Sequence, residues 1–215
     1  MTYLPSAFVQ EDPERLRALM RSSPLAVLAT FGDGRLQVSH VPLLVDEGEG
    51  APAILRGHLA RANPLVQHYD PSVEAVAIFS GPDAYVSPSA YATKRESGKV
   101  VPTWNYAAVY AYGSLRFLDE HEQKHAVVSA LTREHEAALP APWAVTDAPA
   151  DFIEAQLRAV SAFEFHVTRL EGKWKLSQNR TQADREGVIA ALGKSTAHGA
   201  HEVHEAMRRQ YGAED

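Results

Sequence analysis

The amino-acid sequence predicts a mainly β fold with peripheral helices, in which short strands form a barrel or a sandwich. Strand-like apolar runs occur in the first part of the chain, at residues 25–31, 36–45, 53–58 and 73–79. Turn-forming sequences separate them, because Gly32-Asp33-Gly34 indicates a tight turn and Asp46–Gly50 is a turn that no strand could contain. Short strands joined by Gly-rich turns are typical of barrels and sandwiches rather than of parallel α/β sheets.

Two further strands are expected later in the chain. Residues 106–118 read as one long strand that ends at Asp119. Further on, Phe163, Phe165 and Val167 alternate with polar residues, which is the period of a half-buried strand.

Helices are expected around these strands. Asp12-Pro13-Glu14 is a helix start, with a capping Asp, Pro at the first helical position and an acid in the first turn. This helix ends before Pro24, and a short helix opens at Asn63-Pro64-Leu65. The remaining helices are expected over residues 120–139, with an apolar stripe at Ala126, Val127, Ala130 and Leu131, over 151–160, and over 184–192 and 201–209, which are polar and peripheral.

Residues 80–102 form a long segment without a clear hydrophobic period. They contain three prolines and two glycines, and such a stretch in a compact domain is usually functional or a misread element. A functional loop is favoured here because aromatic rings and cations occur together: Tyr85, Tyr91, Lys94, Arg95 and Lys99.

Length and composition favour one globular domain. The chain has 215 residues, of which 45% are hydrophobic and 22% charged, as is ordinary for a soluble protein. We expect a domain over residues 1–192 and a polar helical tail over residues 193–215. No apolar run approaches the roughly 18 residues of a membrane span. The first residues lack the features of a signal peptide, so we expect a cytoplasmic location without membrane contact.

The charge balance restricts the partners. Acidic residues outnumber basic ones by 27 to 21, which gives a net charge of −6. Nucleic-acid binding draws much of its affinity from Lys and Arg that neutralise phosphates, so this balance argues against direct contact with nucleic acid. An anionic small molecule needs only one or two well-placed cations and is not excluded. The absence of cysteine excludes disulfides and thiolate chemistry.

Two histidine patterns have the spacing of metal ligands, but in both an explanation without a metal is favoured. Residues 121–125 (His-Glu-Gln-Lys-His) match a zinc-protease pattern, yet the polar residues Gln123 and Lys124 within the motif favour a solvated helix face. His198, His201 and His204 could chelate a metal weakly, but a frayed polar tail is favoured. A P-loop, a nucleophile elbow and a dinucleotide fingerprint are absent from the sequence.

Three segments combine polar and aromatic groups in a way that is unusual for a core. Residues 56–64 place a His, an Arg and an Asn where a strand meets a helix start, which suits a phosphate as well as an ordinary capped turn. Residues 100–106 present a hydroxyl, an indole, an amide and a phenol, a mixture that suits a flat heteroaromatic ligand as well as a core Trp. Residues 174–180 place polar groups after an apolar strand, and alone they favour a solvated loop.

Blocks within and around these segments resemble the signature sequences of PaiB-type proteins, a family of FMN-binding negative transcriptional regulators. The blocks follow the family order from about residue 1 to residue 192: Tyr3–Phe8, Gly57–Pro64, Phe79–Pro82, Tyr85–Pro88, Val101–Tyr106 and Lys175–Arg180. Ser80 departs from the pattern, because family members often carry a longer polar residue there. The resemblance implies an FMN-binding split β-barrel related to pyridoxamine phosphate oxidases, usually a homodimer with flavin sites between subunits.

The resemblance also implies which residues contact FMN. The candidates are His58, Ala60, Arg61 and Asn63 for the ribityl phosphate end, Ser39, His40 and Val41 for the isoalloxazine through backbone groups, Trp104 and Asn105 for the ring from the same or the other subunit, Gln178 and Asn179 to close the site, and Lys94 as a weaker phosphate or ring-edge contact.

These implications favour an FMN-binding redox or sensory protein with a negative regulatory role in transcription. Whether it is also an enzyme stays open, because no paired carboxylates or nucleophile–base set marks further catalytic machinery. Two alternatives remain. One is a repressor that binds DNA directly, which the acidic balance opposes. The other is a flavin- or haem-linked oxidoreductase, for which no histidine has a diagnostic spacing.

Overall fold

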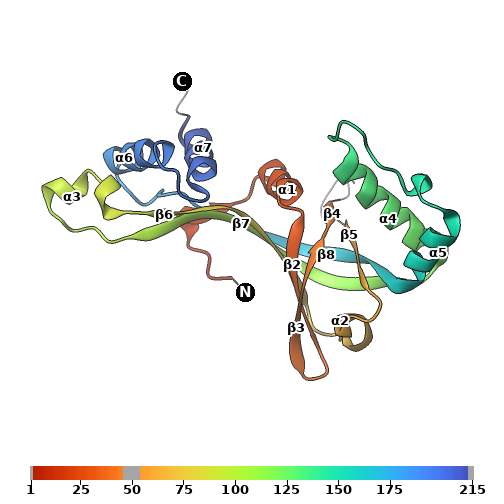
Figure 1. Ribbon diagram of the computed structural model, residues 1–215. Helices are drawn as coiled ribbons and strands as arrows, with labels where there is room; N and C mark the ends of the chain where they lie inside the picture. Colours follow the sequence, from red (N-terminus) through yellow and green to blue (C-terminus); the bar gives the residue numbers. More distant parts are fainter. Residues whose placement is uncertain (1, 46–53, 213–215) are drawn as a thin grey trace. The chain divides into compact units, whose positions relative to one another are not determined.

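A computed structural model describes residues 2–45 and 54–212 of the chain. Its strands form a mainly antiparallel, open sheet in the order β3-β2-β6-β7-β8-β5-β4, with β1 paired to β8 (Figure 1). The strands are β1 Val9–Gln10, β2 Leu25–Gly32, β3 Arg35–Pro42, β4 Leu44–Val45, β5 Ile54–Ala60, β6 Ala75–Val86, β7 Thr103–Leu118 and β8 Val160–Lys175. The helices are α1 Pro13–Ser22, α2 Pro64–His68, α3 Thr93–Glu96, α4 His121–Glu136, α5 Ala150–Ala159, α6 Gln182–Gly193 and α7 Ala200–Tyr211. The predicted mainly β fold with peripheral helices is confirmed.

Two compact units divide these elements. The terminal unit consists of Met1–Leu16, Ser80–Val109 and Glu171–Asp215, and the hairpin unit consists of Arg17–Phe79 and Tyr110–Leu170. Strands β6, β7 and β8 contribute residues to both units. Among the described helices, none combines the length and the apolar character that crossing a membrane requires.

The β2–β3 hairpin belongs to the hairpin unit. Its two-residue turn places Asp33 and Gly34 at φ 53° and 71°, the backbone conformation that a tight hairpin turn needs. The single strand predicted over residues 36–45 is wrong, because β3 ends at Pro42 and residues Leu44–Val45 form β4, which pairs with β5. Pro has no N–H to extend a ladder, which explains the break. The turn predicted at Asp46–Gly50 lies outside the described residues.

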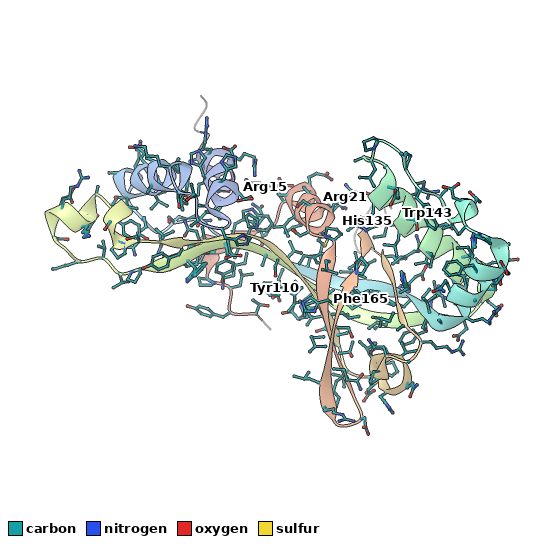
Figure 2. The ribbon with its side chains drawn as sticks, in the orientation of Figure 1. Arg15, Arg21, Tyr110, His135, Trp143 and Phe165 are labelled. Atoms are coloured by element: carbon teal, nitrogen blue, oxygen red, sulfur yellow. The ribbon has the colours of Figure 1, made fainter. Side chains whose placement is uncertain are left out.

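Helix α4 packs on β4, β5 and α5 in the same unit. The helix contributes Val127 and Leu131 to a buried cluster with Leu118 of β7 and Ala162 of β8, and Leu44 packs against this cluster. The predicted apolar stripe is partly wrong, because Ala126 is exposed and Lys124 is buried in its place. Phe165 of β8 is fully buried (Figure 2), and strand alternation places it on the face opposite the cluster residue from β8.

The terminal unit corrects the loop predicted over residues 80–102. Strand β6 continues to Val86, followed by a 3-10 helix at Pro88–Ala90 and by α3. The first part of this stretch is therefore a strand that contains Gly81-Pro82, a sequence that usually indicates a turn. β7 also begins earlier than predicted, at Thr103.

Helices α6 and α7 lie side by side over the part of β6 and β7 that belongs to the terminal unit (Figure 1). They are not simply polar, because Val188, Leu192, Val203 and Met207 are buried. The frayed tail expected at His198 to His204 is wrong, since α7 is a regular helix that starts at Ala200. Whether residues 193–215 form a part separate from the barrel domain stays a prediction.

Candidate functional site

Within the hairpin unit, the end of β5 joins two of the predicted stretches. Asn63 caps α2, because its Oδ1 accepts a hydrogen bond from the Leu65 N–H at 3.0 Å. Its Nδ2 donates to Oγ of Ser39 on β3, also at 3.0 Å. The fold therefore brings Ser39 and Asn63 together, and the amide fixes the chain between β5 and α2.

His58 lies on β5 and is half-buried. Its Nδ1 is buried and has no hydrogen-bond partner among the described residues. Burial lowers the pKa of His58 below its ordinary value, so the imidazole is neutral at pH 7. A buried polar atom without a partner is unusual, so this ring nitrogen is a candidate for a contact with a ligand.

Arg61 is the free cation of this segment. Its backbone N–H donates to the Ala159 carbonyl at 2.8 Å, while its side chain is exposed and makes no hydrogen bond or ion pair within the described chain. Ala60 is likewise exposed at the end of β5. The guanidinium fork is thus free to bind an anion, a geometry that suits phosphate.

The predicted residues of β3 lie on an edge strand of the sheet. Ser39, His40 and Val41 pair with β2, and only Val41 is buried. An edge strand leaves part of its backbone N–H and C=O groups without a ladder partner. A backbone role for this stretch is therefore compatible with its place in the sheet and stays a prediction.

Trp104 and Asn105 begin β7 in the terminal unit and differ sharply in exposure. Trp104 is 53% exposed and meets the Tyr85 ring edge-on at 5.9 Å between centroids, so the alternative of a core Trp is wrong. Asn105 is fully buried, and its amide nitrogen donates to Ser177 Oγ at 2.9 Å. Lys94 is exposed and donates to Ser89 Oγ at 2.8 Å.

The turn after β8 is tightly held. Ser177 is buried and adopts φ 68°, a left-handed conformation that few residues other than Gly favour. Gln178 stabilises this turn with both ends of its amide, because Oε1 accepts from the Leu176 N–H at 2.7 Å and Nε2 donates to the Trp174 carbonyl. The solvated loop favoured for this segment is therefore wrong. Asn179 is exposed, and its role toward FMN stays a prediction, as does that of Gln178.

A small polar cavity in the terminal unit was missed by sequence reasoning. It measures about 50 Å³ and is lined by Tyr91, Thr103, Asn105, Lys175, Ser177, Asn179 and Arg180. Of these, only Asn105 and Asn179 were predicted as site residues. The available signal was the presence of two cations, Lys175 and Arg180, in the last family block, but nothing in the local sequence indicates that Tyr91 lies beside them.

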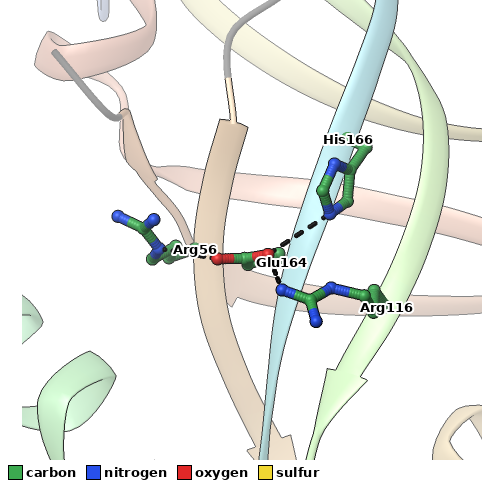
Figure 3. A network of polar contacts seen from close by, with 4 residues as sticks. All are labelled: Arg56, Arg116, Glu164 and His166. Carbon is green, nitrogen blue, oxygen red and sulfur yellow. Dashed lines mark hydrogen bonds and ion pairs between the residues drawn. The ribbon is translucent and has the colours of Figure 1, made fainter. Parts of the chain in front are cut away.

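A second missed feature is a charge network around Glu164 in the hairpin unit (Figure 3). Arg116 Nη2 and Arg56 Nε donate to this carboxylate at 2.6 and 3.2 Å, and His166 Nε2 lies 3.2 Å from it. The Arg116 hydrogen bond and then that of Arg56 hold the pKa of Glu164 below its usual value, against the opposing effect of burial. The strand alternation placed Glu164 on the polar face, but it is buried.

The histidine patterns have other contacts. His121 Nε2 lies 2.9 Å from the Glu154 carboxylate, and His204 Nδ1 lies 2.9 Å from the Ile189 carbonyl oxygen. Across residues 2–45 and 54–212, no group of three or more His, Asp or Glu side chains is placed to hold a metal ion.

The open antiparallel sheet with its covering helices is that of the split β-barrel, a fold found in flavin-binding proteins. The flavocytochrome Anf3 from Azotobacter vinelandii aligns with a TM-score of 0.55 at 15% identity, over 81% of this chain and 70% of that one. The FAD and heme binding protein from Mycobacterium smegmatis aligns with a TM-score of 0.56 at 17% identity, over 85% and 79%. At these identities the likeness concerns the fold alone.

The sequence profile described as "Putative FMN-binding domain" matches residues 2–169, and the chain belongs to this FMN-binding family. An uncharacterized protein of Emericella nidulans is 32% identical over 225 residues, 88% of this chain and 90% of that one. "Protease synthase and sporulation protein PAI 2" of Bacillus subtilis is 28% identical over 206 residues, 95% and 96% of the two chains. The PaiB resemblance is confirmed, and FMN is the cofactor that the family indicates.

Proposed function

We propose that the chain is an FMN-dependent redox or sensory protein that works as a homodimer in the cytoplasm. One family block contains both a buried His58 Nδ1 without a hydrogen-bond partner and an Arg61 side chain without a partner in the described chain, and this observation supports the proposal most. With Asn63, these residues would hold the phosphate end of FMN, while Ser39, which accepts a hydrogen bond from Asn63, would line the isoalloxazine through its backbone. When bound, the flavin supplies one- or two-electron redox chemistry, while the protein binds, orients and tunes it.

The direct test is a flavin spectrum of the purified protein and the elution position of its released cofactor, which should be that of FMN. Arg61→Ala should lower the affinity for FMN about 10- to 100-fold, because a hydrogen bond to a charged group contributes about 1.5–3 kcal/mol. Riboflavin, which has no phosphate, should bind as before. Arg35→Ala is the control, because that guanidinium already pairs with Asp33 at 2.8 Å. Equal loss of both ligands would refute the phosphate role.

The homodimer is supported by an apolar face of the hairpin. Leu36 and Val38 lie on one face of β3 and are 74% and 60% exposed. A second copy of the chain would cover them, since exposed apolar patches often mark interaction sites. Light scattering should show a dimer that Val38→Lys converts toward monomer, whereas Val73→Lys, at an exposed valine outside this strand, should leave the mass unchanged. A monomeric wild-type protein would contradict the proposal.

Any effect on transcription is proposed to be indirect. The Bacillus subtilis relative is named for protease synthesis and sporulation, but the net charge of −6 opposes phosphate binding. The protein should therefore fail to shift promoter DNA at low salt, and a salt-sensitive shift would instead favour the direct repressor. A Soret band after haem addition would favour the haem-linked oxidoreductase.

A further inference from the structure

We propose that the small cavity of the terminal unit binds an oxyanion group, a carboxylate or a phosphate, through Lys175, Arg180 and Tyr91. It is formed at the start of β7, the end of β8 and the turn that follows, with Tyr91 from the segment before α3. Its volume of about 50 Å³ exceeds the roughly 10–15 Å³ that one water needs. A group of a few heavy atoms therefore fits.

Lys175 is a cation without a carboxylate partner among the described residues. Its Nζ donates to Thr103 Oγ1 at 2.6 Å and to the Trp104 carbonyl, both neutral acceptors, and an ammonium has three N–H donors. Burial lowers the pKa of Lys175, and the nearby charges of Lys173 and Arg180 lower it further. An anion would relieve this repulsion and bond the remaining donor.

The acidic side chain near Arg180 does not neutralise this cluster. Asp184 is buried and accepts from Thr93 twice, from the backbone N–H and from Oγ1, at 2.9 Å each. Its charge acts on Arg180 and adds to the rise that burial causes in the pKa of Tyr91, whereas the hydrogen bonds of Lys175 go to neutral acceptors. The cavity therefore keeps an excess of positive charge.

Tyr91 supplies an independent indication. The residue is 2% exposed, and its hydroxyl is buried without a hydrogen-bond partner in the described part of the chain. The Arg180 guanidinium lies 4.7 Å from the ring centroid. Burial raises the pKa of Tyr91, and Arg180 opposes this rise by its charge and by a weak interaction with the hydroxyl that does not meet hydrogen-bond geometry. An unmade hydrogen bond in a buried place is costly, and an oxyanion in the cavity could accept it. Ammonium, guanidinium and phenol are all donors, and this set selects an anion over a cation.

The oxyanion could be the acid group of a substrate or the phosphate of FMN itself, and three forms of the protein distinguish these sources. Inorganic phosphate and acetate are titrated calorimetrically into flavin-free, riboflavin-loaded and FMN-loaded protein. We expect one of them to bind all three forms, as a site separate from the cofactor requires. Binding that disappears only in the FMN-loaded form, and that Lys175→Met weakens but Arg61→Ala does not, would keep the oxyanion site, assign it to the flavin phosphate and contradict the role of Arg61. If the protein takes up no flavin, the flavin-free titration still tests the cavity.

Two variants locate the binding. Lys175→Met and Tyr91→Phe should each weaken the bound anion about tenfold or more, while Lys99→Met, at an exposed lysine outside the cavity, should change nothing. Tyr91→Phe removes a hydroxyl that has no partner, so its thermal unfolding should match wild type and a folding defect will not mask the result. The proposal is overturned if neither anion binds any form, or if Lys99→Met weakens binding as much as Lys175→Met.

Discussion

Replacing Glu164 by Gln should destabilise the hairpin unit through the network shown in Figure 3. The carboxylate side chain is only 10% exposed and receives the Arg116 and Arg56 guanidinium groups at 2.6 and 3.2 Å. An amide of the same shape keeps the packing but loses the charge. Both guanidinium groups then face a neutral and partly mismatched partner.

The size of the loss follows from the exposure of the partners. Removing one partner of a buried ion pair costs about 3–5 kcal/mol, whereas exposed pairs contribute up to about 1 kcal/mol. The Arg116 side chain is 59% exposed, so solvent screens part of the interaction. We expect Glu164→Gln to lower the free energy of unfolding by about 2 kcal/mol, which corresponds to a Tm decrease of roughly 4–8 °C for a chain of this size.

Chemical unfolding at several pH values measures this difference. Because the folded pKa of Glu164 is lowered from 4.5, its contribution is complete above the unfolded value and disappears as the pH falls through the folded one. The gap between wild type and Glu164→Gln should therefore close in acid. Asp33→Asn, in an exposed pair with Arg35, should change stability by less than about 0.5 kcal/mol. A gap that is absent at pH 7, or unchanged in acid, would refute the reasoning.

Two further predictions concern packing and the flavin. Gly113→Ala should lower the free energy of unfolding by about 3 kcal/mol or prevent folding, because its Cβ would lie 2.0 Å from the His166 carbonyl oxygen. Gly34→Asn, in an open turn, is the control, and differential scanning fluorimetry should give it an unfolding temperature close to that of the wild type. Trp104→Ala should lower the affinities for FMN and for riboflavin alike, about 5- to 10-fold in a fluorescence titration. Replacement of the exposed Trp143 by Ala should change neither affinity. A lower affinity for FMN alone would contradict a contact between Trp104 and the flavin ring.

Elements whose ends are decided by local chemistry were predictable from the sequence. The start of α1 was placed correctly, because Asp12 Oδ1 accepts from the Glu14 N–H at 2.9 Å as its position suggested. The cap at Asn63 and the hairpin turn at Asp33-Gly34 are equally local. In each case the residue that indicates the feature also makes the contact.

Strand lengths were less predictable because they depend on distant partners. β8 pairs with β5 over residues 160–166 and with β1 over residues 172–173. Residues 161–165 and Val167 are buried, Thr168 and Arg169 are exposed, and residues 172–174 are buried again. Different neighbours thus cover its two parts, and a single period along the sequence cannot describe both.

The candidate site shows the same limit in its electrostatics. The family resemblance predicts Lys94 as a weaker phosphate or ring-edge contact, but its ammonium is exposed and bonded to Ser89. Lys175 occurs in a family block but was not chosen, and burial beside other cations shifts its titration. Charge interacts far more strongly where water is withdrawn than at the surface. How strongly a cation binds an anionic ligand therefore depends on how far other residues exclude water from it. Some of these residues, such as Tyr91, lie far away in the chain, and the spacing of residues along the sequence does not reveal them.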